Sequence, residues 1–111
     1  PLLELAAREP RVVDLIGRTS VGVLMALIEG SRLVLANDSA ALHMAVGFDR
    51  PAVGLFGPTD VSRVGPYRRE GDVIQHVGAA DVLDHKSPAG ITLMERIGVE
   101  EVVRACRQRL V

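Results

Sequence analysis

The chain has 111 residues and a formal charge of −1, and 48% of its residues are hydrophobic while 3% are aromatic. This composition is typical of one ordinary globular domain, and it excludes disordered, collagen-like and disulfide-built proteins. The near-neutral charge also argues against a dedicated nucleic-acid-binding protein, which usually carries an excess of basic residues.

No membrane span or export signal is found in the sequence. The longest apolar run, Val21 to Ile28, is far shorter than the roughly 20 residues that a bilayer span requires. The single Cys106 cannot form an internal disulfide, which fits a reducing compartment, and we expect it to be a small buried hydrophobic residue. Because the chain opens with Pro1 directly into a helix-like stretch, we interpret it as a piece of a longer protein.

Short runs of branched apolar residues alternate with stretches of helical period, which is typical of βα units that build a parallel sheet. In chain order, the predicted strands are Arg11–Ile16, Arg32–Asn37, Pro51–Phe56 and, more weakly, Asp72–Val77. The predicted helices are Val21–Ile28, which Gly30 ends, then Ser39–Phe48, and a final helix with the apolar stripe Val99, Val102, Val103, Cys106 and Leu110. The predicted fold class is therefore α/β, with a Rossmann-like parallel sheet and flanking helices.

Ligands of an open parallel sheet bind at the carboxyl ends of its strands. Three predicted loops lie at that edge: Gly17–Ser20, Asn37–Ala40 and Gly57–Asp60. Two of them open directly into helices, whose first N–H groups are unpaired and favour an anion such as phosphate. The sequence therefore predicts a phosphate-binding edge.

Each candidate residue at this edge also has a structural interpretation. Asp38 and Ser39, like Thr19 and Ser20, are preferred N-cap residues, and spacing alone favours that capping role. His43 lies four residues beyond Ser39 on the same helix face, where a lone histidine is more often structural than a ligand.

Other chemistry is not indicated. The sequence has no dinucleotide fingerprint, no P-loop and no metal-binding pattern, so we predict neither a cofactor nor a metal site. No partner is predicted for His76, His85 or Lys86.

Three sequence motifs together resemble a known family. Asp38 to Ala45 reads Asp-Ser-Ala-Ala-Leu-His-Met-Ala, Pro51 to Asp60 ends in Phe-Gly-Pro-Thr-Asp, and Gly65 begins Gly-Pro-Tyr. These motifs resemble glycosyltransferase family nine, the heptosyltransferases of lipopolysaccharide assembly, and Leu15 to Ser20 is similar to that family's Leu-x-Gly-Lys-Thr-Ser turn.

The resemblance implies the later part of the C-terminal, nucleotide-sugar-binding domain of a GT-B glycosyltransferase. Residues 1–111 would then be a single partial domain without the N-terminal acceptor domain, which is expected to supply the catalytic base. The implied reaction transfers a heptose from an ADP-sugar to a lipid-linked saccharide acceptor without a bound metal. The implied location is the cytoplasm, with the inner face of the inner membrane as the place where the whole enzyme could meet its acceptor.

By resemblance, the substrate-binding residues are those that contact or border the donor: Thr19, Asp38, Ser39, Ala40, Ala41, His43, Thr59 and Asp60. With the resemblance taken into account, we interpret Asp38 as a site residue as well as a possible cap. Ala40 stands where the family has glycine, and its Cβ limits how closely a diphosphate can approach. The donor could therefore be another nucleotide sugar, and the alternative function is a non-catalytic α/β module that acts in protein interaction.

Overall fold

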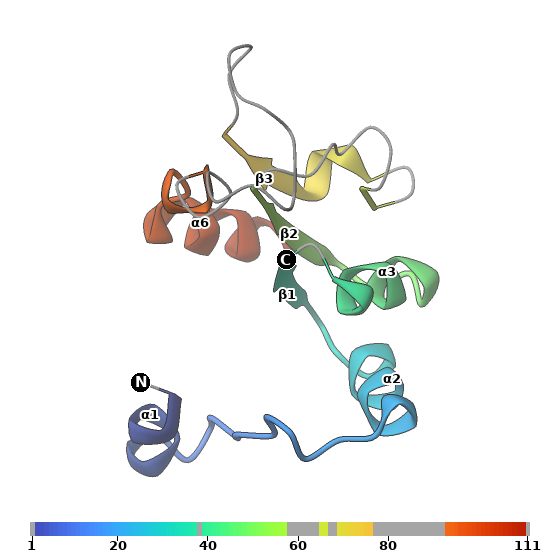
Figure 1. The fold of residues 1–111 in the computed structure, drawn as a ribbon, viewed down its shortest axis with the longest axis vertical. Coiled ribbons are helices and arrows are strands. Elements are labelled where there is room, and N and C mark those ends of the chain that lie inside the picture. Colours follow the sequence, from blue (N-terminus) through green and yellow to red (C-terminus); the bar gives the residue numbers. More distant parts are fainter. Residues whose placement is uncertain (1, 38, 58–64, 67–68, 77–92, 111) are drawn as a thin grey trace.

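The computed structural model of the chain describes residues 2–37, 39–57, 65–66, 69–76 and 93–110. Its sheet has three parallel strands in the order β1 (Val34–Asn37), β2 (Ala52–Phe56) and β3 (Val73–Gln75). The helices are α1 (Leu2–Arg8), α2 (Val21–Glu29), α3 (Ala40–Gly47) and α6 (Val99–Arg109), and a short 3-10 helix, η1 (Glu70–Asp72), precedes β3. The predicted α/β class with a parallel sheet is confirmed (Figure 1).

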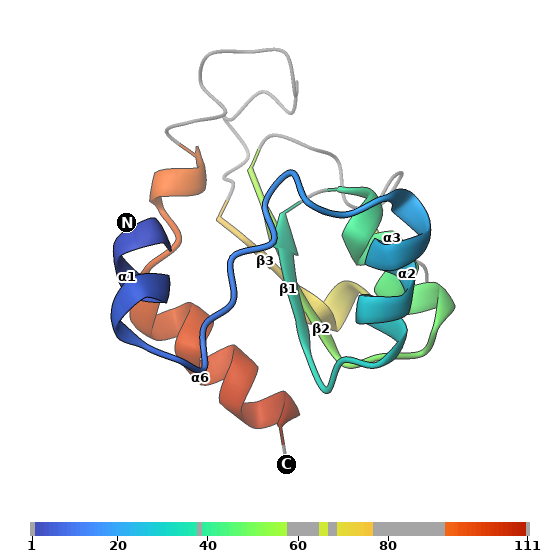
Figure 2. The same cartoon turned by 90° about the horizontal axis from the view of Figure 1, so that it is seen from below.

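Helices cover both faces of this sheet. α3 connects β1 to β2 and packs against both strands, and α2 packs beside α3 on the same face. α6 packs against β2 from the opposite face (Figure 2). The strands around β2 are in register, with Val34 opposite Ala52 and Gly54 opposite Val73.

The hydrophobic core lies between α2, α3 and the sheet. Its buried residues are Ile28, Leu42, Ala45, Ala52 and Phe56. Gly54 lies on the same face of β2, and a Cβ added there would come within 2.7 Å of Leu42 Cδ2. The close packing of α3 on β2 therefore requires the absence of a side chain at this position.

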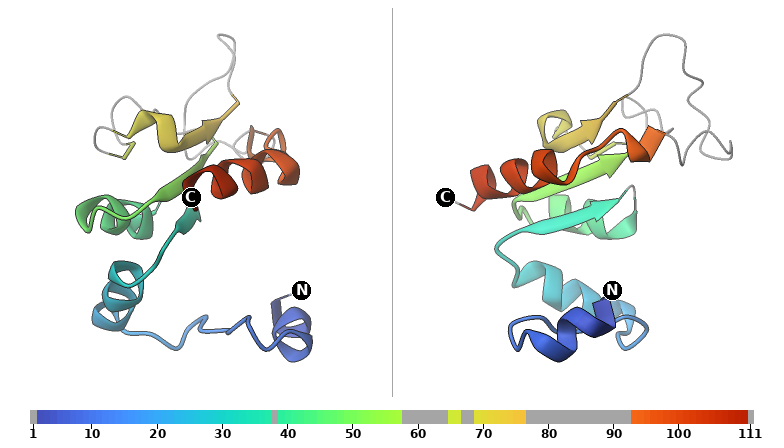
Figure 3. Two further views of the ribbon diagram at one scale, coloured as in Figure 1. Left: turned by 180° about the vertical axis from the view of Figure 1, so that it is seen from behind. Right: turned by 90° about the vertical axis from the view of Figure 1, so that its left-hand side faces the viewer.

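The strand predicted at Arg11–Ile16 is wrong. This segment forms no strand, and Val13 and Ile16 are 70% and 74% exposed. A strand needs a neighbour for its backbone N–H and C=O groups, and Figures 1 and 3 show the segment and α1 lying apart from the sheet. The radius of gyration, 14.9 Å, accordingly exceeds the about 13 Å expected of a compact domain of this length.

The later predictions are closer to the structure. β3 is shorter than predicted, because Asp72 belongs to η1, and Val77 lies outside the described residues. The final helix is confirmed as α6, with Glu100 and Glu101 in its first turn. Its apolar stripe is less buried than expected: Val99 is 79% exposed, and Cys106 is half-buried rather than buried.

Candidate functional site

The carboxyl ends of the three strands meet at one edge of the sheet, called the carboxyl edge below (Figure 3). Asn37, Leu55 and Ile74 lie side by side on the three strands. The residues two positions after them in the sequence are Ser39, Gly57 and His76, which therefore leave the sheet at the same edge. Neighbouring strands lie about 4.8 Å apart, so the edge is about 10 Å wide from β1 to β3. α2 and α3 begin at this same edge (Figures 2 and 3).

The start of α3 lacks a capping hydrogen bond with the side chain of its own N-cap residue. Ser39 is the N-cap residue by its backbone conformation, yet its side chain makes no capping hydrogen bond. Ser20, at the start of α2, behaves differently, because its Oγ accepts a hydrogen bond from the Val23 N–H at 3.2 Å. The capping interpretation is thus confirmed for Ser20, whereas the side chain of Ser39 does not cap α3, and the start of a helix favours an anion.

The predicted residues within the described part of the chain gather around the starts of α2 and α3. Ser39 and Ala40 are exposed at the start of α3, Ala41 is half-buried behind them, and His43 is exposed one turn further along. Thr19 is half-buried in the loop before α2, where Ser20 and not Thr19 forms the N-cap. The predicted residues Asp38, Thr59 and Asp60 lie outside the described residues.

The sequence missed one pair at the carboxyl edge. His76, for which no partner was predicted, directly follows β3, and its Nε2 lies 2.8 Å from both carboxylate oxygens of Glu101 in the first turn of α6. Gln75 Nε2 donates to the Gly57 carbonyl oxygen at 2.8 Å, and Arg96 donates to the His76 carbonyl oxygen at 3.1 Å. These contacts tie the end of β3 to β2 and to the segment around α6. In the sequence, the acidic first turn of α6 is the feature that could have suggested a partner for a histidine. No short-range sequence pattern connects that turn to His76.

The residues that the structure describes contain no cluster of three or more histidine, cysteine or acidic side chains suited to a metal ion. Within the same residues, no helix has the length and apolarity needed to span a membrane. The pKa of the Glu9 carboxyl is lowered because the Arg11 side chain donates to it at 2.7 Å, but this exposed pair lies in the segment that stands apart from the sheet.

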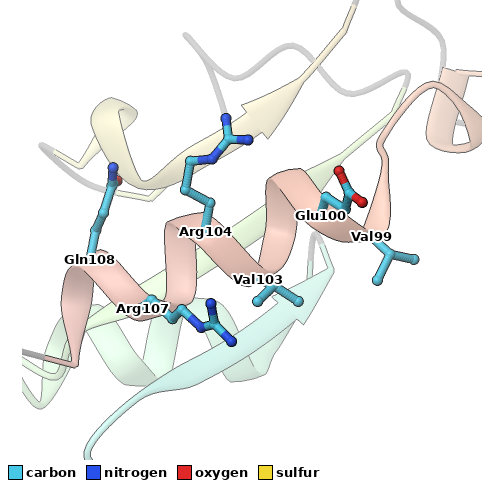
Figure 4. Close-up of a pocket in the computed structure, with 6 residues that line it drawn as sticks. All are labelled: Val99, Glu100, Val103, Arg104, Arg107 and Gln108. Atoms are coloured by element: carbon cyan, nitrogen blue, oxygen red, sulfur yellow. The ribbon is translucent and has the colours of Figure 1, made fainter.

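Two hollows lie along α6, and none of the predicted site residues that the structure describes lines either of them. The first, of about 510 Å³, follows the surface of α6, and its lining among the described residues comes from that helix: Val99, Glu100, Val103, Arg104, Arg107 and Gln108 (Figure 4). The second, of about 410 Å³, lies between α6 and the sheet and has an apolar lining of Leu35, Leu55, Met94, Ile97, Val99, Val102 and Val103. Both hollows share Val99 and Val103, so they form one partly apolar surface beside β1.

Comparison with known proteins gives a consistent result. The profile of glycosyltransferase family 9 (heptosyltransferase) matches residues 2–89. Lipopolysaccharide heptosyltransferase 1 of Salmonella typhimurium is 33% identical over 55 residues, which are 50% of this chain and 17% of that protein. Lipooligosaccharide heptosyltransferase 2 of Haemophilus influenzae is 32% identical over 63 residues, or 57% of this chain and 18% of that protein.

A third relative matches a larger share of the chain. Lipooligosaccharide heptosyltransferase 2 of Haemophilus ducreyi is 28% identical over 79 residues, or 69% of this chain and 23% of that protein. The chain thus spans about a fifth of the length of the curated relatives it matches. No solved structure matches the chain.

Proposed function

Because the chain belongs to glycosyltransferase family 9, the heptosyltransferases, we propose that it binds the nucleotide-sugar donor of a glycosyl transfer in lipopolysaccharide synthesis. The observation that carries the proposal is the start of α3, which the Ser39 side chain does not cap. This start lies at the carboxyl edge of a parallel sheet, which is where such sheets bind ligands.

In the proposed complex, the donor diphosphate lies against the first N–H groups of α3 and the Ser39 hydroxyl. The N–H dipoles at this helix end attract negative charge, and they stabilise the charge that grows on the diphosphate as it leaves the sugar. His43, exposed one turn along α3, is placed to donate a hydrogen bond to the phosphate or the sugar. Asp38 shares this role in the proposal, because it directly precedes Ser39 in the sequence.

The remaining predicted residues surround the same ligand in the proposal. Thr19 borders the nucleoside, because α2 begins beside α3 at the carboxyl edge. Thr59 and Asp60 follow β2 in the sequence and border the sugar. Ala40 is exposed at the start of α3, so its Cβ stands where the donor approaches and restricts which sugar fits. A heptose is the sugar that the description of the family and the names of its relatives favour, and ADP is the nucleotide that the resemblance of the motifs implies.

We further propose that residues 1–111 are the later part of a larger GT-B nucleotide-binding domain. Among the described strands, β1 pairs with β2 alone, so its other edge is open. Leu35 on that strand is 49% exposed, and the segment before α2 lies apart (Figure 1). Further strands of the same polypeptide would fill this space, and a separate domain would supply the catalytic base and bind a lipid-linked acceptor at the cytoplasmic face of the membrane. The chain alone is then expected to bind the donor without transferring the sugar.

The test is a two-dimensional amide NMR titration of the chain with ADP, UDP and GDP. We expect ADP to shift the resonances of Thr19 and residues 39–43. Ser39→Ala should weaken ADP binding about tenfold, because a hydrogen bond to a charged group contributes about 1.5 kcal/mol.

Ser20→Ala is the matched control, since it removes a serine that caps α2 and not the donor contact. It should lower the melting temperature and leave the affinity for ADP unchanged. Dispersed spectra that respond to none of the three nucleotides would contradict the proposed donor site and would favour the alternative, a non-catalytic module. The replacement of glycine by Ala40 is the observation that supports this alternative.

A further inference from the structure

Arginine side chains gather at the opposite edge of the sheet, where the strands begin. Arg32 lies two residues before β1, and Arg50 lies two residues before β2. Arg69 lies just before η1, and Arg109 is the last residue of α6. We call this group the arginine edge, and none of its members belongs to the proposed donor site.

Two of the four arginines are held by carboxylates. Arg109 Nε donates to Asp72 Oδ1 at 2.9 Å, and its two terminal nitrogens donate to the carbonyl oxygens of Gly71 and Ala105. Arg69 donates to Asp49 Oδ1 at 2.7 Å and lies 3.9 Å from Asp72. The charges of Arg69 and Arg109 are therefore balanced by Asp49 and Asp72.

Arg32 and Arg50, in contrast, have no neutralising carboxylate among the described residues. In the described part of the chain, neither guanidinium pairs with a carboxylate. Arg50 Nε is buried and has no hydrogen-bond partner there. A buried charged donor without an acceptor is destabilising, so this arrangement favours an anion that neutralises the guanidinium.

A hollow of about 200 Å³ lies between these side chains. Its lining consists of Ser31, Arg32, Arg50, Pro51, Arg109 and Leu110. It is smaller than the about 300 Å³ at which pockets for drug-sized ligands begin, so it suits a small anion and not a whole nucleotide sugar. The Ser31 hydroxyl already donates to the Leu27 carbonyl oxygen at 2.6 Å, and the Arg109 guanidinium is held by Asp72, Gly71 and Ala105, so Arg32 and Arg50 are the lining residues left to bind an anion.

We propose that Arg32 and Arg50 form a binding site for a phosphate group at the arginine edge, separate from the donor site and independent of it. The planar guanidinium presents paired N–H groups that match two phosphate oxygens, and two unbalanced arginines favour a dianion. The phosphate belongs either to a small soluble molecule or to the headgroup of a phospholipid. Both sources offer the same phosphate chemistry to Arg32 and Arg50.

The first experiment is an NMR titration of the chain with inorganic phosphate, with chloride at matched ionic strength as the reference. Phosphate should shift the amide resonances of Ser31, Arg32, Arg50 and Leu110. Arg32→Gln and Arg50→Gln should each weaken phosphate binding at least tenfold. Arg104→Gln removes the same charge from an exposed position on α6 and should change the affinity less than twofold.

Two outcomes would overturn the proposal. One is the absence of phosphate-specific shifts. The other is that Arg50→Gln lowers the melting temperature equally with and without phosphate and binds it as well as the unaltered chain, which would show that Arg50 only offsets the negative end of a neighbouring helix. If Arg50→Gln does not fold, the exposed Arg32→Gln variant decides the question.

A second experiment separates the two sources of phosphate by co-sedimentation with vesicles. Binding to phosphatidylcholine vesicles that contain phosphatidic acid, but not to phosphatidylcholine alone, would identify a lipid headgroup if Arg32→Gln abolishes it and Arg104→Gln does not. Binding of free phosphate without binding to either vesicle would identify a soluble ligand. Equal vesicle binding by both variants would show non-specific attraction and would contradict the site as a headgroup site.

Discussion

The two faces of the sheet differ in how completely they are covered. On the α3 face, Leu42 and Phe56 have no exposed surface. On the α6 face, Leu35 is 49% exposed and Val99 is 79% exposed, and an apolar hollow of about 410 Å³ remains between the helix and the sheet. The comparison shows that α2 and α3 bury the apolar side chains on their face of the sheet. On the α6 face, some apolar surface is covered by nothing in the described part of the chain.

The connectivity explains the difference. α3 joins β1 to β2, so the chain itself holds this helix over both strands. α6 packs on β2, and within the described residues no connection of this kind places a helix over the α6 side of β1. Val103 and Arg107 point from α6 toward the side of β1 (Figure 4). Three substitutions test how much each face contributes to stability.

The largest effect is expected on the closed face. Phe56→Ala should lower the free energy of unfolding by about 4 kcal/mol, because it removes a fully buried ring and leaves a cavity. Urea denaturation followed by circular dichroism measures the loss. Leu35→Ala, on the open face, is the control and should cost less than about 1 kcal/mol. Equal losses in the two variants would contradict the difference between the faces, and Phe56→Leu replaces Phe56→Ala if the latter is unfolded throughout.

A smaller effect is expected at the contact between α3 and β2. Gly54→Ala should destabilise the chain by about 2 kcal/mol, because the new Cβ would stand 2.7 Å from Leu42 Cδ2. Combining it with Leu42→Ala should make the two losses less than additive, since the second change makes room for the first. Gly47→Ala is the control, because a Cβ there meets no atom within 4 Å. An equal loss in Gly54→Ala and Gly47→Ala would show that the close contact does not limit the packing.

The smallest effect is expected on the open face of α6. Val103→Ala should change the free energy of unfolding by less than about 0.5 kcal/mol, because Val103 is 40% exposed and alanine favours a helix. Thermal melts at two protein concentrations provide the measurement. A loss above about 1 kcal/mol that grows with concentration would show that a second copy covers this face.

The sequence predicted the elements whose signals are local. The continuous apolar run around Val34 and Leu35 indicated a buried strand, and the strand is confirmed as β1, although Leu35 is 49% exposed. The acidic first turn at Glu100 indicated a helix start, which is confirmed. The run at Arg11–Ile16 has the same composition but no neighbouring strand, so it stays outside the sheet. Strand formation depends on a partner, which no local pattern supplies.

The candidate site shows the same limit. Ser20 and Ser39 both precede a helix, and spacing alone gives them the same role. The structure separates them, since Ser20 caps its helix and Ser39 does not. His76 and Glu101 are 25 residues apart, and only the packing of α6 beside the end of β3 brings them together. The direction of a side chain and the pairing of residues far apart in the sequence can therefore be read only from the folded structure.

The link between Arg109 and Asp72 also bears on how the protein is made. The two residues are 37 positions apart, and Arg109 holds Gly71 as well. A ribosome that adds about 5–20 residues per second needs about two to seven seconds to pass from one to the other. During that interval β1, α3 and β2 can already be assembled, while the sheet face that α6 will cover is exposed. Chaperones that recognise apolar strands have those seconds in which to bind the growing chain.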